Sequence, residues 1–259
     1  MSRIIAVANQ KGGVGKTTTS VNLAASLVVM RRTVLIIDMD PQGNTTTGVG
    51  LDKEEQAVTL TEVLLGEVGV REAIQEVPSA KMDALAGGPN LSIAEFKMMT
   101  MDEREYRLHH VLSDIKEDYD YIIIDCPPSL NMLTVNALVA AQGVLIPMQC
   151  EYYALEGLSA LVSSIETIRQ NSNPGLEITG LLRTMYDPRN NLSRDVSNQL
   201  AEYFGDKLYN TSIPRNIRLA EAPSHGLPAL LYDKRSRGAL AYLALAAEMI
   251  RKEASREAA

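Results

Sequence analysis

Residues 9–19 read NQKGGVGKTTT, a glycine-rich run with two lysines that lies between an apolar strand-like run and a helical pattern. In a strand–turn–helix context, successive backbone N–H groups form a concave anion site at the positive end of the helix. Lys16 can reach the β and γ phosphates of a nucleotide, and the Thr17 hydroxyl can hold Mg²⁺. The main chain can approach phosphate oxygens where no Cβ intervenes, at Gly12, Gly13 and Gly15. We therefore expect a nucleotide site, since a plain tight turn would not explain the GKTT that ends the motif.

Acidic residues end two further strand-like runs. VLIIDMD carries Asp38 and Asp40, and YIIID ends at Asp125. An aspartate at the carboxyl end of such a strand is where a Walker B residue binds Mg²⁺, typically through water. A lone acidic residue at a strand end is common in α/β proteins, whereas two such strands together with the phosphate loop predict a metal–nucleotide site.

Strand-like and helical patterns alternate along the chain and would position these residues. Strands are predicted at 4–8, 34–40, 121–127, 144–149 and 178–186, with weaker ones at 82–87 and 207–214. Helices are predicted at 17–31, 103–117, 129–141, 154–171, 193–204 and about 236–256. Several strands are apolar on both faces, which is typical of a parallel sheet covered on two sides. We expect an α/β, doubly wound, mostly parallel twisted sheet with helices on both faces, in a single domain over residues 1–259.

Composition fits a cytoplasmic globular protein with one charged region of interest. The chain has 259 residues, of which 46% are hydrophobic and 22% charged, and no run approaches the roughly 20 apolar residues of a membrane span. Net charge is -7, but residues 183–237 hold 9 Lys+Arg against 6 Asp+Glu, whereas residues 1–182 hold 13 against 23. An acidic chain can still present one cationic face to a polyanion.

The phosphate loop departs from the usual G-x-x-x-x-G-K-[ST] pattern, because Gln10 replaces the first glycine and Lys11 is an additional lysine. The resulting K-G-G-V-G-K-T-T resembles the deviant Walker A loop of P-loop NTPases such as MinD and the nitrogenase iron protein. Five further segments extend this resemblance to ParA (Soj-like) partition ATPases over nearly the whole chain: DMDPQGN, YIIIDCPPSL, QCEYYALEGL, IPRNIRLAEAPSHG and YDKRSRGA.

The resemblance implies ATP or ADP with Mg²⁺, bound by Lys11, Gly12, Gly13, Val14, Gly15, Lys16, Thr17 and Thr18. It implies that Lys11 reaches across a dimer interface to the partner's nucleotide, and that Asp40 orients or activates the attacking water. Thr17, with Asp125 acting through water, would hold the metal. Pro214 and Asn216 are implied as adenine-side contacts, so the catalytic group would be Lys11, Lys16 and Asp40.

The same resemblance suggests Arg189 and Arg218 as contacts to DNA phosphates, with weaker candidates at Arg215, Lys234, Arg235 and Arg237. Any one of them alone could equally form a surface ion pair. No helix-turn-helix segment precedes the phosphate loop, so we expect binding to double-stranded DNA without base readout. The implied cycle is an ATP-dependent homodimer on the nucleoid that a ParB-type centromere-binding partner releases by stimulating slow hydrolysis.

Three other functions are compatible with a phosphate loop of this kind: a membrane-cycling ATPase, a non-catalytic scaffold and an iron–sulfur reductase. A MinD-type membrane-cycling ATPase needs a bulky apolar C-terminal anchor, whereas RKEASREAA offers only alanine, so we expect no membrane partner. In a non-catalytic scaffold whose nucleotide is structural, replacement of Asp40 by alanine would not change cycling. An iron–sulfur reductase is disfavoured by the positions of Cys126 and Cys150. Whether the replicon is a chromosome or a plasmid stays open.

Overall fold

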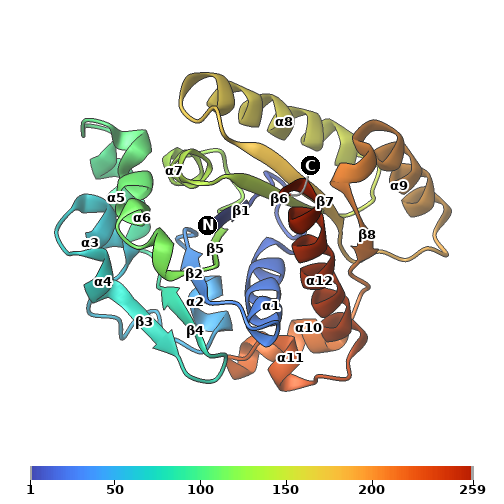
Figure 1. Ribbon diagram of the computed structural model, residues 1–259, viewed down its shortest axis with the longest axis horizontal. Helices are drawn as coiled ribbons and strands as arrows, with labels where there is room; N and C mark the ends of the chain where they lie inside the picture. The colour runs from blue at the N-terminus through green and yellow to red at the C-terminus, as the bar shows by residue number, and fades with distance from the viewer. Residues whose placement is uncertain (1, 258–259) are drawn as a thin grey trace.

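One eight-stranded sheet organises the computed structural model, which describes residues 2–257 (Figure 1). Its strands are β1 Arg3–Val7, β2 Val34–Asp38, β3 Ile74–Val77, β4 Met82–Leu85, β5 Tyr121–Asp125, β6 Gly143–Met148, β7 Glu177–Arg183 and β8 Leu208–Ser212. They lie in the order β3-β4-β2-β5-β1-β6-β7-β8. Every neighbouring pair is parallel except β3 and β4, which are antiparallel. The predicted fold class, a doubly wound and mostly parallel sheet, is confirmed.

Helices cover both faces of this sheet (Figure 1). They are α1 Lys16–Val29, α2 Asn44–Gly48, α3 Leu60–Leu65, α4 Val70–Ala73, α5 Leu91–Met98, α6 Arg107–Ser113, α7 Met132–Ala140, α8 Ala154–Asn171, α9 Asn191–Phe204, α10 Ile217–Glu221, α11 Ala229–Tyr232 and α12 Arg237–Glu257. Short 3₁₀ helices are η1 Arg104–Tyr106, η2 Lys116–Asp118, η3 Gly205–Lys207 and η4 Ala222–His225. Among the described residues, no helix is both long enough and apolar enough to span a bilayer.

Alternation along each central strand builds two hydrophobic cores. In β1, Ile4 and Ala6 pack into the core with α3, α5, α6, α7, α8 and α9, whereas Ile5 and Val7 pack into the core with α1 and α12. Because successive side chains of a strand point to opposite faces, apolar residues at every position produce a sheet that is buried on both sides. In the second core, α1 and α12 lie side by side beneath the sheet (Figure 1). These two helices therefore cover the face of the sheet that carries Ile5 and Val7.

The segment 103–117, predicted as a helix, is helical over most of its length but does not form one continuous α-helix. The segment is instead divided into η1, α6 and η2. A continuous helix would join the Leu108 N–H to the Arg104 carbonyl. The Asn136 side chain takes both groups instead: its Oδ1 accepts from Leu108 N at 3.0 Å and its Nδ2 donates to Arg104 O at 2.8 Å. The Asn136 amide from α7 thus takes the place of one backbone hydrogen bond of an α-helix, which no local pattern could reveal.

Several short elements were absent from the sequence prediction, notably α2, α3, α4, β3 and α5. The predicted strands and the remaining predicted helices are present, with bounds that differ by a few residues. The missed strand β3 has only 4 residues and one buried side chain, Val77, so it lacks the apolar signal of the central strands. The carboxyl ends of β1, β2 and β5 lie side by side in the sheet, which brings the loops after them together.

Candidate active site

The phosphate loop joins β1 to α1 and leaves the amino end of that helix open. Gly13 and Gly15 have φ of 73° and 86°, a left-handed conformation that glycine adopts without strain. Among the described residues no side chain caps this end of α1, and its first turn holds no acidic residue. The first N–H groups of a helix need partners, and together with the helix dipole they favour an anion. The loop therefore fits nucleotide phosphates.

Asp125 collects three hydroxyl groups at the end of β5. Its Oδ2 accepts from Thr17 Oγ1 at 2.8 Å and from Thr45 Oγ1 at 2.7 Å, and its Oδ1 accepts from Ser20 Oγ at 2.9 Å. The carboxyl is fully buried, and burial raises its pKa to about 6. Hard oxygen ligands of this kind suit Mg²⁺, whose charge would keep the carboxylate ionised. Sequence reasoning found Thr17 and Asp125 but missed Thr45 and Ser20.

The two aspartates that follow β2 have different surroundings. Asp38 is used within the protein: its Oδ2 accepts from the Thr46 N–H and hydroxyl, each at 2.8 Å, and its Oδ1 accepts from Asp40 N at 3.1 Å. Burial, reinforced by the nearby Asp125, raises the pKa of Asp38 to about 7. The Asp40 carboxylate accepts only from the Gln42 N–H, at 3.0 Å through Oδ1, among the contacts within residues 2–257. Asp38 thus tethers the loop, while Asp40 keeps an oxygen available for water.

The two lysines of the loop occupy different places. Lys16 is 7% exposed, and its Nζ donates to the Lys11 carbonyl at 3.3 Å. Burial lowers the pKa of Lys16, although the charge of Asp125 opposes this shift. Lys11 instead points to the surface, where its Nζ pairs with Glu151 Oε2 at 2.6 Å and the two side chains are 43% and 46% exposed. The ammonium group of Lys16 therefore lies within the loop, whereas that of Lys11 lies at the surface beside Glu151.

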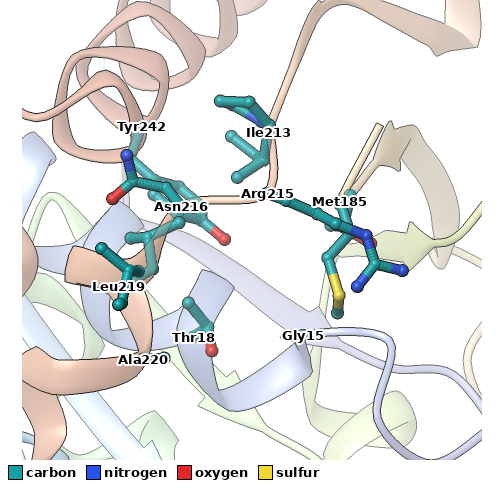
Figure 2. A pocket seen from close by; sticks show the side chains of 12 residues that line it. Gly15, Thr18, Met185, Ile213, Arg215, Asn216, Leu219, Ala220 and Tyr242 are labelled. Carbon is teal, nitrogen blue, oxygen red and sulfur yellow. The ribbon is translucent and has the colours of Figure 1, made fainter. Parts of the chain in front are cut away.

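A cavity of about 350 Å³ lies beside the loop, large enough for a nucleoside. Its walls come from the P-loop, from the segments after β7 and β8, and from α12: Gly15, Thr18, Thr184, Met185, Ile213, Pro214, Arg215, Asn216, Ile217, Leu219, Ala220 and Tyr242. Pro214 and Asn216, the expected adenine-side residues, are both in this wall. Arg215, expected only as a weak DNA contact, also lies here and extends towards Met185 (Figure 2).

The arginines expected at a DNA face are engaged with local carboxylates to different degrees. Arg189 pairs with Asp187 through Nη2 at 2.8 Å and Nε at 3.0 Å, and these hydrogen bonds hold the pKa of Asp187 at about 2. Arg218 pairs with Glu221 at 2.7 Å and with Asp233 at 3.4 Å. Within the described part of the chain, no ion pair involves Arg215, Lys234, Arg235 or Arg237. Of the six candidates, these four form no ion pair among the described residues, although the charge of Arg237 acts on the Asp187 carboxyl.

Comparison with known proteins gives the family. A protein-family model described as an AAA domain matches residues 2–178. The chain is 49% identical over 249 residues to the sporulation initiation inhibitor protein Soj of Bacillus subtilis (strain 168), covering 96% of this chain and 98% of Soj. It is 48% identical over 258 residues to the chromosome partitioning protein ParA of Caulobacter vibrioides (strain NA1000 / CB15N), covering 99% and 97%. The chain belongs to the ParA/Soj family of partition ATPases.

The ParA/Soj chain also has a close structural neighbour with ligands. Cobyrinic acid a,c-diamide synthase from Mycobacterium smegmatis, crystallised with an ATP analog and magnesium, has a TM-score of 0.87 and 37% identity, covering 98% of this chain and 97% of that one. The resemblance predicted from the sequence motifs is confirmed at the level of the family and the fold. The roles of individual residues in the ParA/Soj chain stay predictions, which the geometry above makes specific.

Proposed function

We propose that this ParA/Soj chain, acting as a single P-loop ATPase domain over residues 1–259, is a DNA-segregation ATPase of the cytoplasm. It binds ATP with Mg²⁺, forms a homodimer around the nucleotide, and holds double-stranded DNA of the nucleoid without base readout. A ParB-type centromere-binding partner stimulates hydrolysis, and the ADP form leaves the DNA. The observation that carries this proposal is the position of Lys11, an exposed ammonium group at the rim of a phosphate loop that already contains Lys16.

Within one chain, different residues have different roles at the nucleotide. Bound ATP·Mg²⁺ supplies the phosphoanhydride bond and the metal charge. The open end of α1 and the Lys16 ammonium group balance phosphate charge, while Thr17, and Asp125 through water, hold the metal. Asp40 orients the attacking water through its available oxygen. The wall formed by Pro214 and Asn216 receives the adenine.

Lys11 links nucleotide occupancy to assembly. Its ammonium group exchanges Glu151 for the triphosphate of the partner chain, where the charge of the phosphates is greater than that of one carboxylate. A cation supplied in trans at a transferring phosphoryl group can contribute several powers of ten to the hydrolysis rate. Dimer formation therefore completes two active sites at once.

The proposed DNA face lies in the basic region of residues 183–237. Arg189 and Arg218 exchange their carboxylate partners for DNA phosphates. Arg215, Lys234, Arg235 and Arg237, which form no ion pair among residues 2–257, add further positive charge. Each phosphate contact contributes about -0.9 to the slope of log K against log salt. A dimer presents twice as many contacts as a monomer, so assembly and DNA retention rise together.

The direct test of this function is ATP hydrolysis by the purified chain, alone, with non-specific duplex DNA, and with DNA plus the cognate centromere-binding protein. We expect a slow basal rate and a marked increase only when both DNA and the partner are present. Asp40→Ala serves as the inactive control. A hydrolysis rate that is the same under all three conditions would contradict the partition cycle. A purified wild-type chain that does not bind ATP at all would contradict the nucleotide site.

A further inference from the structure

Two side chains on the β6–β7 side of the site hold carbonyl groups of the phosphate loop. Thr184 Oγ1 donates to the Val14 carbonyl at 2.7 Å, and Gln149 Nε2 donates to the Gly13 carbonyl at 3.1 Å. Thr184 directly follows β7 and is 3% exposed, while Gln149 directly follows β6. These contacts come from the opposite side of β1 to Asp125, which holds the loop through Thr17.

The orientation of a carbonyl fixes the orientation of the next N–H. A trans peptide is planar, so its C=O and N–H bonds point in opposite directions. When Thr184 pulls the Val14 carbonyl outward, the Gly15 N–H of the same peptide points away from Thr184. Gly15 precedes the first residue of α1 and has φ of 86°, so this N–H lies where the open helix end favours an anion. Gln149 acts in the same way on the Val14 N–H.

We propose that Thr184 is a positioning residue for nucleotide phosphates, because its hydroxyl locks the Val14–Gly15 peptide with the Gly15 N–H facing the phosphate site. Gln149 is the second, weaker lock. This inference rests on the proposed function only in requiring that the loop binds nucleotide phosphates.

The backbone of Thr184 is held by the end of the sheet. The Thr184 N–H donates to the Met148 carbonyl at 2.8 Å, which extends the β6–β7 pairing by one residue. The next residue, Met185, has φ of 49° and lines the nucleoside cavity together with Thr184 itself. One sheet end therefore sets both the phosphate loop and a wall of the base-side cavity. Groups held by strands position a site more precisely than groups on free loops.

The test compares Thr184→Val, Thr184→Ser and Thr179→Val in the full-length protein. Valine keeps the shape of threonine but removes the donor, leaving the Val14 carbonyl unpaired; serine keeps the hydroxyl. Thr179 lies towards the other end of β7, where its side chain faces Gly143, so its replacement by valine is a matched control. The readouts are ADP affinity by calorimetry and deuterium uptake of the peptide covering residues 9–19 in nucleotide-free protein.

We expect Thr184→Val to weaken ADP binding about tenfold and to speed exchange in the loop, because an unpaired buried acceptor frees the peptide to rotate. Thr184→Ser and Thr179→Val should bind ADP like the wild type. If Thr184→Val does not fold, Gln149→Met should still weaken ADP binding measurably and speed loop exchange. Wild-type affinity and exchange in a folded Thr184→Val would overturn the inference, whereas failure of the wild type to bind ADP would overturn the proposed function instead.

Discussion

Removal of the Glu151 carboxylate should strengthen the ATP-dependent dimer. In the structure Lys11 is paired with Glu151 of its own chain at 2.6 Å, and the proposed dimer requires each chain to break this pair. Glu151→Gln would release the ammonium group in advance. With both side chains between two-fifths and half exposed, the pair resembles surface ion pairs, which contribute about 0.2–1 kcal/mol each.

The dimer contains two such pairs, so their loss would favour association by about 0.4–2 kcal/mol, a dimer Kd lower by about 2- to 30-fold. The Kd would be measured by sedimentation equilibrium with ATP and Mg²⁺ in an Asp40→Ala background, so that nucleotide is not consumed. Glu156→Gln, an exposed acidic residue on the following helix, removes the same charge without touching Lys11 and controls for general electrostatics. The reasoning fails if Glu151→Gln weakens the dimer, or if both variants tighten it equally.

Further predictions concern catalysis, DNA and stability. Asp40→Ala should lower hydrolysis by at least about 100-fold and leave an ATP-bound dimer on DNA, as seen in a gel-shift assay; wild-type turnover would contradict the role of Asp40. Arg189→Ala should weaken DNA retention and reduce the salt slope by about 0.9 per chain. Asp187→Asn, which removes the carboxylate partner of Arg189, should strengthen DNA retention. If Arg189→Ala retained DNA better than Asp187→Asn, the proposed DNA face would be wrong. Asp38 has a folded pKa of about 7, above its ordinary value, so folding favours its protonated form. Stability should therefore fall by up to about 1.4 kcal/mol per pH unit between about pH 4 and 7 in nucleotide-free protein with EDTA, and Asp38→Asn should flatten this slope in urea titrations.

The candidate nucleotide and metal residues that were identified from the sequence share one property. Each of them lies at a strand end or in the phosphate loop. Asp125 and Asp40 could be placed near Thr17 because the carboxyl ends of parallel strands meet at one edge of a sheet. The apolar runs before them are long enough to identify the strands. The spacing of the glycine, lysine and threonine residues in the phosphate loop is one that few functions other than nucleotide binding need. For these residues the local pattern was sufficient.

The residues that were missed act through contacts that only the assembled sheet creates. Thr45 reaches Asp125 from 80 positions away, and Thr184 reaches Val14 from 170 positions away. A threonine carries no spacing signal of its own, so neither contact could be predicted without the strand order. The same limit applied to Asn136, which interrupts a predicted helix, and to Glu151, whose pairing with Lys11 depends on where β6 ends. Arg215 was grouped with the DNA candidates on the family resemblance, and the fold also places it in the wall of the nucleoside cavity.

The bridging role of Lys11 is tested most directly by the molar mass of the protein in solution with ATP and Mg²⁺, measured by light scattering for the wild type and for Lys11→Ala. Nucleotide binding should be measured on the same samples. We expect the wild type to double its mass when ATP is added, and Lys11→Ala to bind ATP while remaining a monomer. A Lys11→Ala protein that binds ATP and still forms the wild-type dimer would contradict the proposal that this lysine joins two chains through their nucleotides.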